Sequence, residues 1–153
     1  MIPKRKIEII EFWKTSEPYG FLSNFWYATI MISGKIFLTT EHYFQSQKFV
    51  GTEHEYVIIN QLTAYEAAKE GRKKHRPLRA DWNLIKEEIM LTALRAKFTQ
   101  HKHLRDMLLA TGDAYLVESS PVDSYWGTGP DGTGKNKLGI LLMQVREELR
   151  YVN

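Results

Sequence analysis

The chain contains no cysteine, carries little net charge and has no long apolar run. The lack of cysteine excludes disulfides, thiol nucleophiles and cysteine-bound metals. No apolar stretch reaches the roughly 20 residues that span a bilayer, and the first residues, MIPKRK, lack the apolar core of a signal peptide. We therefore expect a soluble protein of the cytoplasm that does not associate with membranes.

The ionisable residues limit the kinds of ligand that can be expected. Lysine and arginine number 21 and aspartate and glutamate 18, which gives a formal net charge of +3. This mild positive charge suits a phosphorylated ligand without requiring nucleic acid. The five histidines show no metal-ligand spacing, because His101 and His103 would face away from each other on a helix. The sequence therefore predicts no metal site.

The length and the apolar spacing predict one mostly helical domain over residues 1–153. Alternating residues predict a strand at 6–9 and a hairpin around Ser33-Gly34, with strands at 29–32 and 36–38. Capping residues mark three helix starts, at Thr39 or Thr40, at Thr63 and at Asp81. The helices are expected at about 40–50, 63–73, 81–98, 104–109 and 137–149. The predicted class is α+β, mostly helical, with a small N-terminal β-sheet or hairpin.

Residues 123–139 combine five glycines with aspartate, asparagine and two aromatic residues. Glycine loses the most backbone entropy on ordering and Pro130 interrupts regular pairing, so this segment is predicted to be a loop. Two interpretations are open. The loop either encloses a ligand, with Trp126 offering a flat face, or it is an ordinary surface turn with a tucked tryptophan.

Nucleotide-binding motifs fit this loop only in part. Gly127, Gly129 and Gly132 match a dinucleotide fingerprint, but that motif also needs a returning strand, and only one helix follows here. A phosphate loop would need serine or threonine at the position of Asn136. What remains is a helix start at about residue 137, which would attract an anion.

A second candidate site lies in the segment TEHYFQSQK at 40–48. Glu41, Gln45 and Lys48 share one face of a predicted helix. Two interpretations are open here as well: a surface ion pair, or an acid, an amide and an amine that point into one cleft. The basic stretch 69–79 is likewise either a solvated helix end or a phosphate contact.

Several motifs follow one another along the chain. They are YGFLSNF at 19–25, TEHYFQSQKF at 40–49, RADW at 79–82, KF at 97–98, TGD at 111–113, LVE at 116–118 and the loop 123–136 with the helix after it. In this order they resemble the NADAR family of YbiA-like proteins, over about residues 10 to 150. One small departure is Trp26-Tyr27, where the family often has an aromatic residue and proline.

The resemblance implies an N-glycosidase that needs no cofactor. Family members hydrolyse the N–C1′ bond of ribosylamine phosphates that arise early in riboflavin synthesis, such as 5-amino-6-ribosylaminouracil 5′-phosphate and its diaminopyrimidinone precursor. Others remove ADP-ribose from guanine bases of nucleic acid, which is the alternative activity. A module that only binds ADP-ribose or a related nucleotide is a third hypothesis. The expected partner is therefore a phosphorylated ribosylamine or an ADP-ribosyl group, in the second case on nucleic acid.

The resemblance also implies roles for particular residues. Lys48 is the predicted nucleophile, Glu41 the proton-transfer group and Asp123 the residue that orients a group or water. An alternative keeps the sugar ring closed, with Glu41 or Asp123 stabilising an oxocarbenium-like transition state. The predicted substrate-binding residues are Gly20, Phe21, Asn24, Tyr43, Gln45, Arg79, Trp126, Gly127, Asp131, Gly132 and Asn136. Among these, Trp126 and Phe21 are expected to stack on the base.

Overall fold

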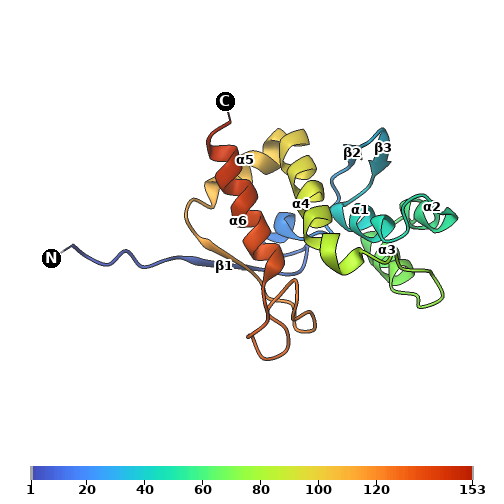
Figure 1. Cartoon of the computed structure of the whole chain (residues 1–153). Helices are drawn as coiled ribbons and strands as arrows, with labels where there is room; N and C mark the ends of the chain where they lie inside the picture. The colour runs from blue at the N-terminus through green and yellow to red at the C-terminus, as the bar shows by residue number, and fades with distance from the viewer. Residues whose placement is uncertain (1, 153) are drawn as a thin grey trace. The chain divides into compact units, whose positions relative to one another are not determined.

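The computed structural model describes residues 2–152 and divides into two compact units (Figure 1). One unit is the continuous segment Asn24–Leu104. The other joins the N-terminal segment through Ser23 to the segment from Arg105 onward. Within the described residues there are six α-helices and two separate two-stranded sheets, which confirms the mostly helical α+β class. The single domain over 1–153 stays a prediction.

The continuous unit begins with a hairpin and is otherwise helical. Strands β2 (Ile30–Ile32) and β3 (Lys35–Phe37) pair antiparallel. Ser33 and Gly34 both have positive φ, of 53° and 77°, as a two-residue hairpin turn with the right twist requires. The predicted hairpin is therefore confirmed, with each strand shifted by about one residue.

Four helices follow the hairpin, and the first is the central one. They are α1 (Thr40–Gln47), α2 (Glu53–Ile59), α3 (Ala64–Gly71) and α4 (Trp82–Gln100). Helix α1 contacts each of the other three helices and also β3 (Figure 1). Its two apolar neighbourhoods are a cluster of Ile30, Phe37, Tyr43, Ala93 and Ala96, and a cluster of Phe49, Ile58 and Ala67.

The capping predictions were right at two of three helices. The Thr39 hydroxyl accepts a hydrogen bond from the His42 N–H (3.1 Å), and the Thr63 hydroxyl accepts one from the Glu66 N–H (3.1 Å). Helix α4 does begin directly after Asp81, but the Asp81 side chain does not cap it. Its carboxylate binds Arg79 instead. Helix α2 was not predicted.

The second unit is built on a parallel strand pair. Strands β1 (Ile9–Phe12) and β4 (Tyr115–Glu118) run parallel, with Ile10 opposite Leu116. The predicted strand at 6–9 is wrong in position. The apolar residues of that alternation, Ile7 and Ile9, are exposed, and the strand that pairs with β4 buries Ile10 and Phe12 instead. Strand β4 was not predicted, and neither was the 3₁₀ turn η1 (Gly20–Leu22).

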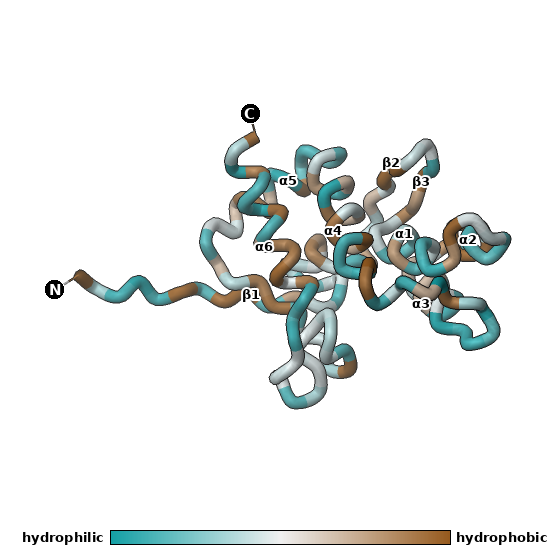
Figure 2. The backbone as a smooth tube through the Cα atoms, in the orientation of Figure 1, coloured by the Kyte–Doolittle hydropathy of each residue, from teal (hydrophilic) through white to brown (hydrophobic). Residues whose placement is uncertain are grey.

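Helix α6 (Lys137–Arg150) packs on β4. Its buried apolar residues recur at helical spacing and are Leu138, Leu141, Leu142, Val145 and Leu149. Figure 2 shows the resulting alternation of hydrophobic and hydrophilic stretches along α6. The shorter helix α5 (Lys102–Ala110) ends before Gly112, whose φ is +62°, as the Thr111-Gly112 signal predicted. Among the helices of residues 2–152, none has the length and apolar character needed to cross a membrane.

Asn136 joins the start of α6 to β4. Its φ is +50°, and its buried side chain accepts a hydrogen bond from the Glu118 N–H and donates one to the Leu116 carbonyl, both at 2.9 Å. Asparagine tolerates the left-handed conformation better than most residues, because its side chain bonds locally. Both ends of the amide are thus used for structure, and the predicted contact of Asn136 with substrate stays a prediction.

We predict that Asn136→Ala lowers the free energy of unfolding by about 2–4 kcal/mol, because two buried backbone groups lose their partners. Urea titration followed by circular dichroism measures this. Asn83→Ala is the matched control, since Asn83 is exposed, and its effect should stay within about 0.5 kcal/mol. Equal midpoints for the Asn136 variant and the unmodified protein would contradict this role.

Candidate active site

The start of α1 is held in place by Asn24. The Thr40 hydroxyl donates to the Asn24 side-chain oxygen (2.9 Å), and the Glu41 N–H donates to the Asn24 carbonyl (3.2 Å). The Asn24 amide N–H₂ faces the Met90 sulfur at 3.4 Å. Asn24 is buried, so the role visible in the structure is to position α1. Its predicted bond to sugar or base stays a prediction.

Glu41 and Gln45 form a buried polar pair on α1. Gln45 Nε2 donates to Glu41 Oε1 at 2.8 Å, and the two residues expose only 3% and 6% of their surfaces. The other amide atom, Gln45 Oε1, is buried and has no hydrogen-bond partner among the described residues. A buried amide oxygen without a hydrogen-bond partner is costly, which favours the cleft interpretation over a surface ion pair.

Gly71 sets the distance between α3 and this pair. A Cβ at residue 71 would lie 2.1 Å from Gln45 Oε1, so only glycine allows the present approach. The Gly71 carbonyl in turn accepts a hydrogen bond from Lys48 Nζ at 3.3 Å. Gly71 thus contacts two of the three residues predicted on the face of α1. Sequence reasoning missed it, because a glycine at a helix end has the usual signature of a helix stop.

The amine of Lys48 lies against an aromatic wall, formed by the rings of Phe44 and Trp82. Its Nζ lies 5.8 Å from the centre of the Trp82 ring and 6.0 Å from that of Phe44, and the two rings are 5.0 Å apart. Burial lowers the pKa of Lys48, the Arg72 charge lowers it further, and the Glu41 charge opposes both. The amine therefore loses its proton more easily than an exposed lysine does, which a nucleophilic role requires.

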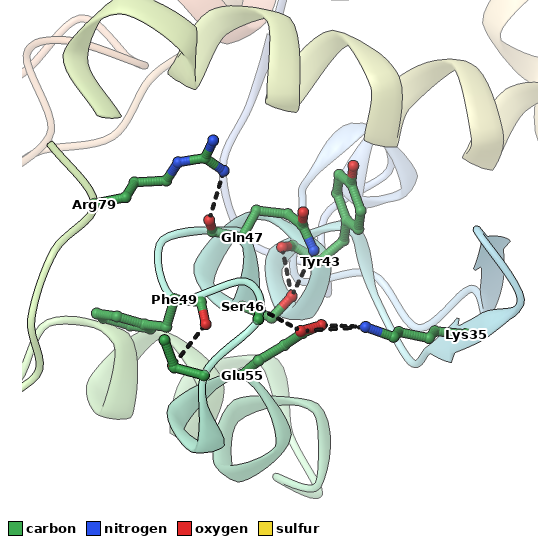
Figure 3. Close-up of polar contacts among 9 residues, drawn as sticks. Lys35, Tyr43, Ser46, Gln47, Phe49, Glu55 and Arg79 are labelled. Carbon is green, nitrogen blue, oxygen red and sulfur yellow. Dashed lines mark hydrogen bonds and ion pairs between the residues drawn. The ribbon is translucent and has the colours of Figure 1, made fainter. Parts of the chain in front are cut away.

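Figure 3 shows Tyr43, a residue of α1, and Arg79, whose side chain reaches the carbonyl of Gln47 at the end of that helix. The Arg79 guanidinium binds both Asp81 oxygens (2.7 and 3.2 Å) and donates to the Gln47 carbonyl at 3.3 Å. Tyr43 is buried and packs edge-on against Phe37, with ring centres 5.0 Å apart. Burial raises the pKa of Tyr43 and the nearby Arg79 charge opposes this rise. These contacts hold α1 in place, and the predicted binding roles of both residues stay predictions.

Asp123 shapes the glycine-rich loop. Its Oδ1 accepts hydrogen bonds from the N–H groups of Tyr125 (2.9 Å) and Trp126 (2.8 Å). The Tyr125 and Trp126 rings meet edge to face, with centres 5.0 Å apart, and both are half-buried. One oxygen of Asp123 is thus engaged in fixing the turn that presents Trp126. The catalytic role of Asp123 and the stacking role of Trp126 stay predictions.

The glycines of this loop serve its internal packing. A Cβ at Gly127 would lie 2.7 Å from the Glu118 carbonyl oxygen, and one at Gly134 would lie 2.5 Å from the Gly127 carbonyl oxygen. Gly132 has φ of +77°, and Asp131 beside it accepts hydrogen bonds from the N–H and hydroxyl of Thr133, which lowers the pKa of Asp131. The loop therefore needs its glycines to fold, whether or not it also encloses a ligand.

The start of α6 is less available to an anion than the sequence suggested. The N–H groups of Lys137 and Leu138 already donate to the carbonyls of Tyr125 and Trp126.

At Gly20, a Cβ would lie 2.2 Å from the Thr15 carbonyl oxygen, so glycine is again required by packing. Phe21 exposes only 3% of its surface, which leaves little area for its predicted stacking on a base.

The structure thus groups the predicted residues into two sets. Within the segment Asn24–Leu104, it brings together Glu41, Gln45 and Lys48, with Arg79 close to the end of α1. Within the other unit, one loop carries Asp123, Trp126, Gly127, Asp131, Gly132 and Asn136. In the range 2–152 no cluster of three histidine, aspartate or glutamate side chains could hold a metal ion.

Comparison with known proteins identifies one family. Residues 11–150 match the NADAR domain. N-glycosidase YbiA of Escherichia coli (strain K12) is 49% identical over 141 residues, which cover 92% of this chain and 88% of that protein. A riboflavin biosynthesis protein of Vibrio vulnificus is 41% identical over 141 residues, 92% of this chain but 38% of that protein. The NMR structure of E. coli YbiA matches with a TM-score of 0.88 and 47% identity, over 95% of this chain and 87% of that one.

We predict that the pKa of Lys48 responds in opposite directions to its two charged neighbours. Arg72→Gln should raise it, because a repelling positive charge is lost, and Glu41→Gln should lower it, because a stabilising negative charge is lost. The pH titration of the ¹³Cε resonance of Lys48 measures both changes. Lys74→Gln is the control and should leave the titration unchanged. A shift of the same sign in the Arg72 and Glu41 variants would contradict the arrangement.

Proposed function

This chain belongs to the NADAR family, and from that premise we propose that its N-glycosidase activity cleaves the N–C1′ bond of ribosylamine 5′-phosphates. The proposed substrates are 5-amino-6-ribosylaminouracil 5′-phosphate and its diaminopyrimidinone precursor. The name of the Vibrio vulnificus relative supports a link to riboflavin synthesis. Such substrates join an exocyclic amine to C1′ of a ribose, so the sugar ring can open to an imine that an amine nucleophile attacks.

One observation carries the proposed mechanism. The amine of Lys48 lies against the rings of Phe44 and Trp82, and the charge of Glu41, seven residues earlier on the same face, acts on the pKa of Lys48. Burial favours the neutral amine, and only a neutral amine can attack C1′. Gln45 holds Oε1 of Glu41 at 2.8 Å and so fixes the orientation of that carboxyl group.

The reaction begins on the open-chain imine of the substrate. In the reacting state a proton of the Lys48 ammonium has moved to the Glu41 carboxylate. Glu41 gives this proton to the imine nitrogen, and the neutral Lys48 amine attacks C1′ to form a C1′–Nζ bond. A proton then moves from Nζ to the nitrogen of the base. The bond between that nitrogen and C1′ breaks, and the amine of the base leaves. The sugar remains on Lys48 as a protonated imine.

Hydrolysis then restores the enzyme. Water adds to C1′ and gives a proton to the Glu41 carboxylate, which returns this group to its reacting state. The proton of the new hydroxyl moves to Nζ, the C1′–Nζ bond breaks, and ribose 5-phosphate leaves as the aldehyde that closes to a ring. The roles expected of Asp123, which is to orient a group or water, and of Trp126, which is to stack on the base, stay predictions.

We predict that the purified protein releases ribose 5-phosphate and the free base from either riboflavin intermediate. Chromatography of the reaction mixture against a buffer blank measures this. Glu41→Gln should slow the release by about 100-fold or more, because proton transfer by a positioned carboxyl contributes 10²–10⁴. If neither intermediate loses its sugar faster than in buffer, the substrate assignment fails. An oligonucleotide carrying ADP-ribose on guanine is then the substrate that tests the wider glycosidase class.

We predict that borohydride added during turnover traps the sugar on Lys48, because it reduces the imine to a stable amine. Mass mapping of peptides should find the adduct on this residue. Lys48→Ala should abolish both trapping and turnover, whereas Lys74→Ala, at an exposed lysine, should preserve both. Turnover retained in Lys48→Ala, or an adduct on another lysine, would show that the nucleophile is misassigned. Turnover without any adduct in the unmodified protein would favour the closed-ring mechanism.

A further inference from the structure

Helix α3 and the two residues after it line a depression that has no part in the proposed mechanism. Its volume is about 230 Å³, and its lining residues are Tyr65, Lys69, Arg72 and Lys73. Tyr65 and Lys69 share one face of the helix, and Arg72 and Lys73 follow directly after its last residue, Gly71. All four residues are exposed, and the Tyr65 ring exposes 67% of its surface.

The depression is strongly basic. Three of its four lining residues are cationic, and within residues 2–152 only Lys73 of these three forms an ion pair, with Glu70 at 2.7 Å. Cations near a helix C-terminus are common, because they complement the helix dipole. Solvation of a helix end, however, does not require a depression lined by an aromatic ring. The combination of a hollow, converging cations and an aromatic edge is what a phosphate-bearing sugar or nucleotide would contact.

The depression lies beside the proposed nucleophile. Lys48 Nζ donates to the carbonyl of Gly71, the residue directly before Arg72. The positive charge of Arg72 also acts on the amine of Lys48. Lys48, Gly71 and the four lining residues all belong to the segment Asn24–Leu104, so this neighbourhood is defined within one unit.

We propose that this depression binds the phosphate of the ribosyl substrate, with the phosphate between Lys69 and Arg72 and C1′ of the same sugar at Lys48. This proposal rests on the proposed function for the position of C1′. The shared chemistry is a phosphate attached to the 5′ carbon of ribose. It is supplied either by a terminal monophosphate or by the pyrophosphate of an ADP-ribosyl group, whose adenine would then lie toward Tyr65.

Isothermal titration calorimetry with ribose 5-phosphate tests the site without requiring turnover. We predict that Lys69→Gln and Arg72→Gln each raise the dissociation constant of ribose 5-phosphate by about three- to tenfold, because each removes a charged donor to phosphate. Lys74→Gln is the matched control, since it removes an equal charge from an exposed neighbour that does not line the depression, and it should change binding less than twofold. Ribose without phosphate should bind equally to all variants.

The source of the phosphate is read from a second titration with ADP-ribose. If Tyr65→Ala weakens the binding of ADP-ribose but not that of ribose 5-phosphate, the site accepts a pyrophosphate ligand. If Tyr65→Ala affects neither, the site is built for the monophosphate, and both results support a phosphate site. The proposal is overturned if ribose 5-phosphate does not bind the unmodified protein, or if Lys69→Gln and Arg72→Gln bind it as well as Lys74→Gln does. It is also overturned if only a single-stranded oligonucleotide responds to these variants, which would indicate a nucleic-acid surface.

The two hypotheses can fail separately. Binding of ribose 5-phosphate that depends on Lys69 and Arg72, together with no hydrolysis of any ribosylamine, would keep the phosphate site and refute the proposed reaction. Hydrolysis in which Lys69→Gln changes neither KM nor kcat would keep the reaction and refute the phosphate site. For a binding residue remote from C1′, the expected pattern is a higher KM with kcat nearly unchanged.

Discussion

The segment Asn24–Leu104 is organised around the burial of a polar helix. Seven of the eight residues of α1 are buried, and four of these are Glu41, His42, Gln45 and Ser46. Each buried polar group costs about 1–3 kcal/mol if it lacks a partner, so the surrounding elements must supply partners. The Thr39 hydroxyl and the Gln61 carbonyl contact the two nitrogens of the His42 ring. At the start of the helix, the Asn24 side-chain oxygen accepts a hydrogen bond from the Thr40 hydroxyl. On the face that carries Glu41, Gln45 and Lys48, the buried Gln45 Oε1 has no hydrogen-bond partner among residues 2–152.

This arrangement is the reason to place the candidate site on α1 rather than on a surface loop. A helix fixed on several sides holds its side chains within narrow limits, and catalysis by a lysine depends on that precision. The aromatic wall of Phe44 and Trp82 removes water from the amine, while Gly71 lets α3 approach closely enough to complete the enclosure. Packing and chemistry are therefore supplied by the same contacts, and a change at Gly71 would disturb both.

The sequence predicted the parts of the fold that depend on local signals. The Ser33-Gly34 hairpin, the Thr63 cap and the final helix follow from residues within a few positions of one another. The pairing of β1 with β4 does not, because the partners are about a hundred residues apart and neither strand carries a strong pattern of its own. The helical spacing of Glu41, Gln45 and Lys48 was visible in advance. Their burial and the role of Gly71 were not, because both depend on where α3 packs.

The pairing of Ile10 with Leu116 also has a consequence for synthesis of the chain. Residues 24–104 form one continuous unit and can begin to fold as soon as they leave the ribosome. The N-terminal strand, although made first, has no partner strand until residues 115–118 have been made. Contacts between such distant residues form slowly, because a long loop must close first. During translation, the exposed apolar residues of β1 therefore wait longest for burial, and this strand is the part of the nascent chain most exposed to chaperones and proteases.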